Sequence, residues 1–233
     1  MIQKKIVRYG ILMMIGIIVN LVGKWIATTL QLPLWLDAIG TGVTSCLLGP
    51  IWGDVCGVIN NMVNGLADPL SLAYGLTSAA IGIVMGICMR KGMFRDLFHA
   101  MTTSVIVALV SVVISTPLNL LNWGGMIGNV WGDGLFGMLT SHGMNAVVAS
   151  GLGELFVDFP DKVVVVLITY ALLRLPILQQ WFQTEQYLQE KVQGTHATSW
   201  KKLLFMVPVL LYCLTMTVVN VDAAKSEEES EQA

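Results

Sequence analysis

The stretch from Leu34 to Asp68 reads LWLDAIGTGVTSCLLGPIWGDVCGVINNMVNGLAD, and it decides the fold. A single helix of this length would be about 50 Å long, whereas the hydrocarbon core of a bilayer is ~30 Å thick. Pro50 lacks an amide proton and disfavours helical backbone at Gly49. We therefore expect two helices of roughly 15 residues each, separated at Gly49-Pro50.

These two short helices are unusually polar for a membrane segment. Short, polar, glycine-bearing helices survive at membrane depth only when they are buried in protein or line a cavity. We therefore expect the function of the protein to reside in a cavity beside them. The polar residues of the stretch are Asp37, Asp54, Asn60, Asn61, Asn64 and Asp68.

The composition is that of an integral membrane protein. Hydrophobic residues make up 55% of the chain, charged residues make up 12%, and the mean hydropathy is +0.72. The chain lacks the basic patch expected of a nucleic-acid-binding protein. Its four cysteines stand singly in apolar runs, so we expect small buried side chains rather than a disulfide or a metal site.

Further apolar runs indicate the remaining spans. The first run, Ile6–Ala27, is too long for a signal peptide and is expected to be a retained span. Pro117 is expected to close the fifth span. The glycine-rich region 118–155 is interpreted as a partly helical cap over the membrane mouth of the protein. The other expected spans are Leu72–Met89, Leu97–Thr116, Phe156–Leu175 and Leu203–Val221.

The predicted fold is therefore an all-α integral membrane protein, a compact bundle of six transmembrane helices with a seventh C-terminal span. Four regions follow from this count. They are a six-helix substrate-binding core at 1–176, a polar cytoplasmic or interfacial connector at 177–202, an additional transmembrane helix at 203–221 and an acidic, disordered tail at 222–233.

The distribution of positive charge predicts the orientation. With the N-terminus in the cytoplasm, ten of the thirteen basic residues lie inside. If Leu34–Asp68 were one span, the cluster of Arg90, Lys91 and Arg95 would lie outside instead. We therefore expect a multi-pass protein of the plasma membrane with a cytoplasmic N-terminus. The inside residues are Lys4, Lys5, Arg8, Arg90, Lys91, Arg95, Arg174, Lys191, Lys201 and Lys202.

One candidate ligand-binding stripe lies on the second half of the quoted stretch. Asn60, Asn64 and Asp68 recur every four residues, so they share one helix face that rises towards the external mouth. Hydrogen bonding between helices is the alternative role for the asparagines. For Asp54, which lies deeper, a helix-end or partner contact is favoured over substrate contact.

A second candidate is the group Asp158, Asp161 and Lys162 at the expected start of the span 156–175. Charged groups at membrane depth tend to pair or to face water. A lysine at a helix N-terminus is opposed by the helix dipole, so an anionic ligand group or a paired aspartate would explain Lys162. An interfacial anchor is the alternative.

Tryptophans lie at the expected external boundaries. Trp35, Trp123 and Trp131 could belong to an aromatic belt or could stack on a flat ligand. His142 is expected to be structural. The chain has no catalytic, nucleotide-binding or metal-binding motif, so we expect neither an enzyme nor a cofactor. The further substrate-binding candidates are Asp37, Tyr74 and Asn122.

Three segments resemble the substrate-binding S components of energy-coupling factor (ECF) transporters. They are LDAIGTGVTSCLLGPIWGDVCGVINN from Leu36, YGLTSAAIGIVMG from Tyr74 and FPDKVVVVLITYALLRL from Phe159. The resemblance covers roughly Ile6 to Pro176 in order and spacing. It implies a small six-helix bundle that captures a vitamin-like nutrient from outside, while a separate transmembrane T component and two ATPases drive transport.

The chain departs from the family in two ways. Family members commonly carry an alanine stripe on the first helix that contacts the T component, and here Gly16, Gly23 and Ala27 occupy the corresponding face. The seventh apolar run and the acidic tail lie outside the six-helix core. A ligand-binding membrane sensory module without transport activity is the alternative function, although the chain has no recognisable output domain.

Overall fold

The computed structural model describes residues 2–180, and every regular element in this range is helical. The connector beyond residue 180, the additional span at 203–221 and the tail at 222–233 lie outside the described residues. The elements are α1 (Ile2–Thr29), α2 (Ile39–Leu48), α3 (Pro50–Asn64), the 3-10 helix η1 (Pro69–Leu72), α4 (Gly75–Arg90), α5 (Leu97–Trp123), α6 (Val130–Ser141) and α7 (Ala146–Leu172).

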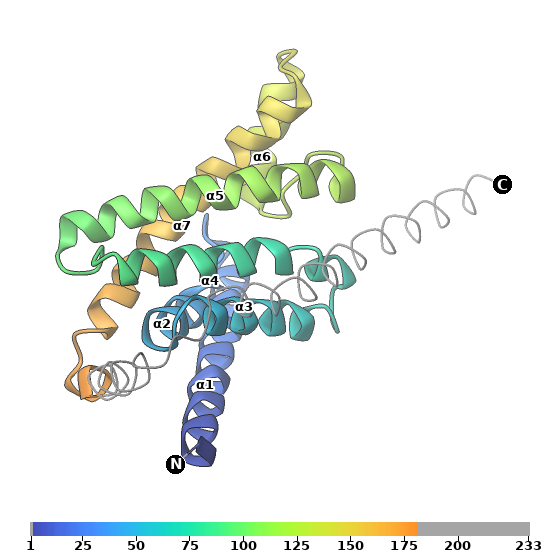
Figure 1. Ribbon diagram of the computed structural model, residues 1–233. Helices are drawn as coiled ribbons and strands as arrows, with labels where there is room; N and C mark the ends of the chain where they lie inside the picture. Colours follow the sequence, from blue (N-terminus) through green and yellow to red (C-terminus); the bar gives the residue numbers. More distant parts are fainter. Residues whose placement is uncertain (1, 181–233) are drawn as a thin grey trace, which may run out of the picture.

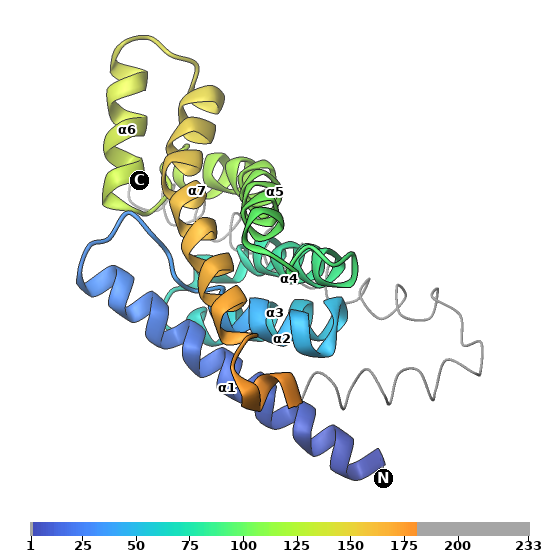
Figure 2. The same ribbon diagram turned by 90° about the vertical axis from the view of Figure 1, so that its left-hand side faces the viewer.

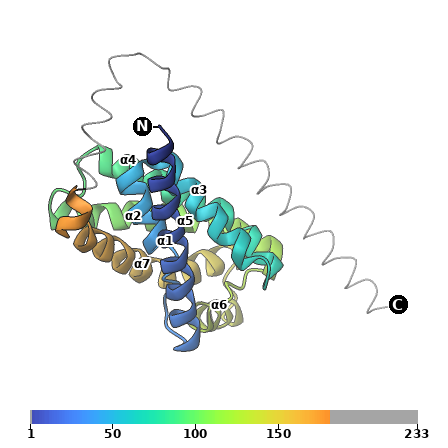
Figure 3. The same cartoon turned by 90° about the horizontal axis from the view of Figure 1, so that it is seen from below.

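The helices are arranged in layers around α4. In Figure 1, α4 lies between α3 and α5, while α1 crosses the lower side of this stack. Figure 2 shows α6 beside the first half of α7, far from the N-terminal end of α1. Seen from below in Figure 3, α1 runs across α2 and α3 rather than alongside them. α7 packs against both α5 and α2 and so connects the two sides of the molecule.

The predicted break at Gly49-Pro50 is confirmed. α2 ends at Leu48, and α3 begins with Pro50 in its first turn, where the missing amide proton costs nothing. Gly49 has φ of 104°, a conformation that glycine adopts without strain. α2 is shorter than expected, with ten residues, because the chain remains irregular as far as Ala38.

The start of α2 is capped by a side chain from another helix. Ala38, at the N-cap position, has no side chain that could bind the free amide groups of the first turn. Asn20 of α1 takes this role: its Oδ1 accepts from the amides of Gly40 (2.7 Å) and Thr41 (3.4 Å). Its Nδ2 donates to Thr41 Oγ1 at 2.8 Å. Asn20 is fully buried, so it joins α1 to α2 by hydrogen bonds inside the protein.

The small residues of α1 pack within the chain. A side chain at Gly40 would collide with the backbone of Gly16, so α1 and α2 cross in direct backbone contact. A side chain at Gly23 would collide with the carbonyl of Leu36, and Ala27 is buried. The stripe expected to face a T component therefore faces α2 and the loop before it. An outside partner could not reach it without displacing them.

The main hydrophobic cluster is built by α2, α4, α5 and α7. Its largest fully buried members are Met85, Val107, Val165 and Val166. Cys46 and Cys88 belong to this cluster, and Cys56 is buried in α3; none of the three forms a disulfide, as expected. Cys213 lies outside the described residues.

Two predicted helix boundaries are wrong. α5 does not end at Pro117 but continues to Trp123, and α7 begins at Ala146, ten residues before Phe156. Both helices contain a proline in their interior, Pro117 and Pro160. Neighbouring helices in membrane proteins compensate for the missing amide, so proline is a weaker stop there than in water. The expected cap at 118–155 consists of the end of α5, the helix α6 and the start of α7.

Three helical segments are long and apolar enough to cross a membrane: Ile6–Thr29, Pro69–Arg90 and Leu97–Trp123. They indicate a membrane protein. α2 and α3 are too short for this criterion, and α7 carries Glu154, Asp158, Asp161 and Lys162 in its middle. A count of six or seven spans stays a prediction.

The cap on α2 gives the first testable prediction. Replacing Asn20 with alanine leaves the buried amide of Gly40 without an acceptor, which should lower the free energy of unfolding by about 1–3 kcal/mol. Thermal unfolding in detergent micelles measures the loss. Met14→Ala on the exposed side of α1 is the control and should change stability little. Equal stability of the two variants would contradict the capping role.

Candidate functional site

A cavity of about 280 Å³ lies between the loop before α2, the start of α4 and the facing sides of α5 and α7. This volume is near the lower end of the ~300–1,000 Å³ typical of small-molecule pockets. Its lining combines charged, hydroxyl and aromatic side chains with only two aliphatic ones. The lining residues are Lys24, Thr28, Trp35, Asp37, Asn61, Asp68, Ser71, Tyr74, Thr77, Ser78, Ile81, Ser111, Ser115, Trp123, Ile127, Gly128, Glu154, Asp158 and Lys162.

A buried ion cluster on α7 forms one wall of the cavity. Lys162 Nζ lies 3.0 Å from Asp158 Oδ1 and 2.7 Å from Asp161 Oδ2. All three side chains are at most 2% exposed. Lys162 lies in the middle of α7, not at its N-terminus, so the argument from the helix dipole does not apply. Of the two explanations offered for this lysine, the structure supports paired aspartates.

The second oxygen of Asp161 holds the loop between α1 and α2. Asp161 Oδ1 accepts hydrogen bonds from the backbone amides of Trp35 (3.0 Å) and Leu36 (2.8 Å). Leu36 has φ of 54°, which is uncommon for a residue other than glycine. Two hydrogen bonds to a carboxylate help to retain this conformation, because such bonds are stronger than those between neutral groups.

The start of α6 holds the same loop from its other side. Asn129 Nδ2 donates to the carbonyl of Leu32 at 3.1 Å, and Trp131 Nε1 donates to the carbonyl of Gln31 at 2.8 Å. The loop therefore lies between α7 and the α6 region, and its Trp35 and Asp37 line the cavity. Trp131 is 52% exposed and does not line the cavity.

The opposite side of the mouth is built around η1. Asp68 caps this short helix through the Leu70 amide (3.2 Å), and its Oδ2 accepts from Ser71 Oγ at 2.8 Å. Lys24 of α1 reaches over from the other side, with Nζ 3.4 Å from Ser71 Oγ. Lys24 is therefore part of the cavity wall, and not only a residue near the end of a span.

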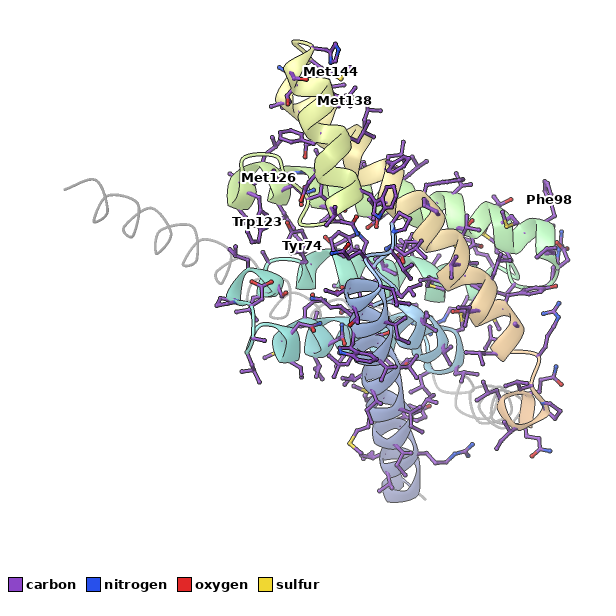
Figure 4. All side chains as sticks on the ribbon, turned by 180° about the vertical axis from the view of Figure 1, so that it is seen from behind. Tyr74, Phe98, Trp123, Met126, Met138 and Met144 are labelled. Carbon is purple, nitrogen blue, oxygen red and sulfur yellow. The ribbon has the colours of Figure 1, made fainter. Side chains whose placement is uncertain are left out.

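A hydrogen-bonded chain runs beside the cavity from Tyr74, just before α4, to α7. Tyr74 OH donates to Asn119 Oδ1 at 2.6 Å, and Asn119 Nδ2 donates to Glu154 Oε2 at 2.7 Å. Asn119 is fully buried and Glu154 is 3% exposed. Figure 4 shows Tyr74 and Trp123 close together, where the start of α4 meets the end of α5. Both rings line the cavity.

The structure brings seven of the twelve predicted substrate-binding residues to the cavity. Asp161 lies directly behind them, with its two oxygens bonded to Lys162 and to the loop. Asn60, Asn64, Asn122 and Trp131 do not line the cavity. The seven are Trp35, Asp37, Asp68, Tyr74, Trp123, Asp158 and Lys162.

The predicted stripe on α3 is displaced by one residue. Asn61, not Asn60, lines the cavity, and its Nδ2 donates to Gly57 O (3.1 Å) and Ser78 Oγ (2.6 Å). Asn60 is fully buried away from the cavity. Asp68 lies beyond the end of α3, so the four-residue helical spacing does not extend to it. The helix ends at Asn64, which the sequence pattern alone did not indicate.

Several cavity residues were not predicted. Glu154 lies one helical turn before Asp158, so the four-residue spacing could have identified it had α7 been expected to begin early enough. The hydroxyl residues Thr77, Ser78, Ser111 and Ser115 carry no sequence signal that separates them from ordinary helix-packing residues. Lys24 was not among the predicted binding residues either.

Asp54 is the main buried polar group outside the cavity. It is 1% exposed, and neither carboxylate oxygen has a hydrogen-bond partner within residues 2–180. It does not line the cavity, so the structure gives it no contact with a ligand there. His142 is exposed at the end of α6 and bonds to the carbonyl of Met138.

The lining of the cavity is chemically mixed. Over the described residues, no group of three or more histidine, cysteine, aspartate or glutamate side chains is placed to hold a metal. The cavity instead offers aromatic faces, hydroxyl groups and carboxylates to a small organic molecule. Comparison with known protein families, curated proteins and solved structures finds no match to this chain.

The ion cluster gives the second prediction. Replacing Lys162 with methionine leaves two neighbouring buried aspartates without their counter-charge and should cost about 3–5 kcal/mol of stability. Adding Asp158→Asn to the same protein should restore part of this loss, because one uncompensated charge is removed. Unfolding of both variants in detergent tests the coupling. A stability of Lys162→Met equal to that of the unchanged protein would contradict it.

Proposed function

We propose that this protein is the substrate-capture subunit of an ECF-type importer, binding a small nutrient from outside the cell. The observation that carries the proposal is the cavity next to the loop between α1 and α2. Charged and aromatic side chains line it, and of these Glu154, Asp158 and Lys162 are buried. The cavity's composition fits recognition of a polar small molecule, because a few positioned polar groups fix orientation while aromatic faces supply contact area.

The cavity is bounded on its inner side by hydrophobic packing. Ile81 lines the cavity and is also a member of the main hydrophobic cluster. A pocket that ends on a packed core suits capture of a ligand better than passage through the isolated subunit. Transport would then require other subunits, in agreement with the absence of a nucleotide-binding motif from the sequence.

A T component would bind most readily on the exposed side of α1. Ile11, Ile15, Ile18 and Val22 are 46–57% exposed and repeat at helical spacing, so they form one apolar stripe. This stripe is open to lipid or to another membrane helix. The glycine stripe on the opposite side already contacts α2 and the loop that follows α1.

Orientation in the membrane gives the third prediction. Leu66 and Lys91 are exposed and lie on either side of the apolar segment Pro69–Arg90. With a cytoplasmic N-terminus, a cysteine replacing Leu66 should react with a membrane-impermeant maleimide added to intact cells. One replacing Lys91 should react only after the membrane is opened. Reaction of the Lys91→Cys protein in intact cells would exclude the proposed orientation.

The function is tested by binding and then by uptake. Purified protein is screened for thermal stabilisation by vitamin-like compounds, and radiolabelled binders are then offered to cells. Uptake should require co-expression of a T component and its two ATPases. Concentrative uptake by the subunit alone would contradict the proposal. Binding without uptake in any combination of subunits would favour the sensory alternative.

A further inference from the structure

The charges that line the cavity do not balance. Four carboxylates face it, from Asp37, Asp68, Glu154 and Asp158, but only two amino groups, from Lys24 and Lys162. Asp161 lies directly behind Lys162 and adds a further negative charge. Unpaired charge is costly in a buried site, because the low local dielectric weakens screening. Additional positive charge from a ligand would reduce this imbalance.

Neither lysine supplies that charge. Lys162 is engaged by two aspartates at 3.0 and 2.7 Å, so two of its three N–H donors are used within the protein cluster. Lys24 bonds to Ser71 Oγ, and no carboxylate in the described part of the chain lies within ion-pair distance of it. An anionic ligand would add to the negative charge that already surrounds Lys162. An anionic ligand group is therefore not proposed as the partner of Lys162.

The deficit is centred on Glu154 and Asp158. These side chains lie one turn apart on the same face of α7 and are 3% and 1% exposed. Glu154 accepts one hydrogen bond, from the neutral amide of Asn119. Asp158 lines the cavity, and its Oδ2 is buried and has no hydrogen-bond partner among the described residues. This oxygen requires a donor, and a positively charged donor would also reduce the repulsion between the two carboxylates.

We propose that the ligand carries a protonated amine, which binds between Glu154 and Asp158. An N–H group is needed because the free Asp158 oxygen must accept a hydrogen bond, which a quaternary ammonium cannot supply. The rings of Tyr74 and Trp123, close together in Figure 4, and that of Trp35 provide faces for a cation and for a flat body next to it. This inference rests on the proposed capture function and specifies its substrate class as small organic cations.

The test uses matched probes on the purified full chain. 2-Phenylethylamine, 2-phenylethanol and phenylacetate differ mainly in charge and are compared by thermal shift and by calorimetric titration. Methylammonium chloride and tetramethylammonium chloride at equal ionic strength separate N–H donation from charge alone. The amines with N–H groups should stabilise the protein and the other three probes should not.

Variants then locate the binding site. Glu154→Gln and Asp158→Asn should each weaken 2-phenylethylamine roughly tenfold to a hundredfold, the effect expected from losing one charge-assisted hydrogen bond. Asp96→Asn is the matched control, because it removes a carboxylate outside the cavity and asparagine caps a helix equally well. Its affinity should equal that of the unchanged protein. If an α7 variant fails to fold, the other one and the probe series still decide the outcome.

Several outcomes would overturn the inference. They are stabilisation by phenylacetate or 2-phenylethanol equal to that by the amine, no stabilisation by any amine, and unchanged amine affinity in both α7 variants. If the two carboxylates instead share a proton and need no cation, no amine will stabilise the protein, and the probe series will overturn the inference. Capture and uptake of a neutral or anionic nutrient would refute the amine class alone. Amine binding that never leads to uptake would refute the transport function alone.

Discussion

The cavity depends on the two oxygens of one carboxylate. Asp161 bonds through Oδ2 to Lys162 and through Oδ1 to the amides of Trp35 and Leu36. The bond to Lys162 lies in the wall of the cavity, and the two bonds to Trp35 and Leu36 hold the loop that borders the cavity. An ion pair at this depth loses much of its Coulombic gain to desolvation. Its contribution here is therefore to fix the position of a loop relative to a helix, at a modest net gain in stability.

A buried polar side chain on α1 also holds a neighbouring segment by hydrogen bonds to its backbone amides. Asn20 bonds to the first amides of α2, as Asp161 bonds to the loop just before it. Two long helices thus use buried polar side chains to fix one short connection and the short helix that follows. α2 has only ten residues, and its own sequence does not cap its N-terminus. Asn20 of α1 and Asp161 of α7 supply hydrogen-bond acceptors to the first turn of α2 and to the loop before it.

The sequence predicted the elements whose boundaries follow from local chemistry. Gly49-Pro50 ends one helix and begins another, because glycine allows the positive φ and proline lacks an amide proton. The same reasoning failed at Pro117, where neighbouring helices support a continuous α5. Part of the site was predicted because it, too, has a local sequence signal. Charged residues in apolar runs were conspicuous, so Asp158, Asp161 and Lys162 were found, although the role assigned to the lysine assumed a helix start that α7 does not have.

Other cavity residues could not be identified before the helices were placed. Whether Asn60 or Asn61 faces the cavity depends on the rotation of α3, and a rotation of one residue exchanges them. Serine and threonine line both cavities and helix contacts in membrane proteins, so Thr77 and Ser115 had no distinguishing pattern. The same dependence on helix placement applies to the residues predicted to contact a T component. A stripe of small residues indicates close approach, but Gly16 and Gly23 approach the chain's own backbone.

The charge on the cavity wall links ligand binding to the stability of the fold. Lys162 pairs with two aspartates of a cluster that Glu154 extends by one turn. A ligand of the proposed cationic class would add positive charge to this cluster, and a ligand that binds only the folded chain raises its stability by mass action. Because Asp161 also bonds to the loop between α1 and α2, the charge of the cluster affects how firmly that loop is held. Recognition of the ligand and closure of the cavity would then depend on one set of side chains on α7.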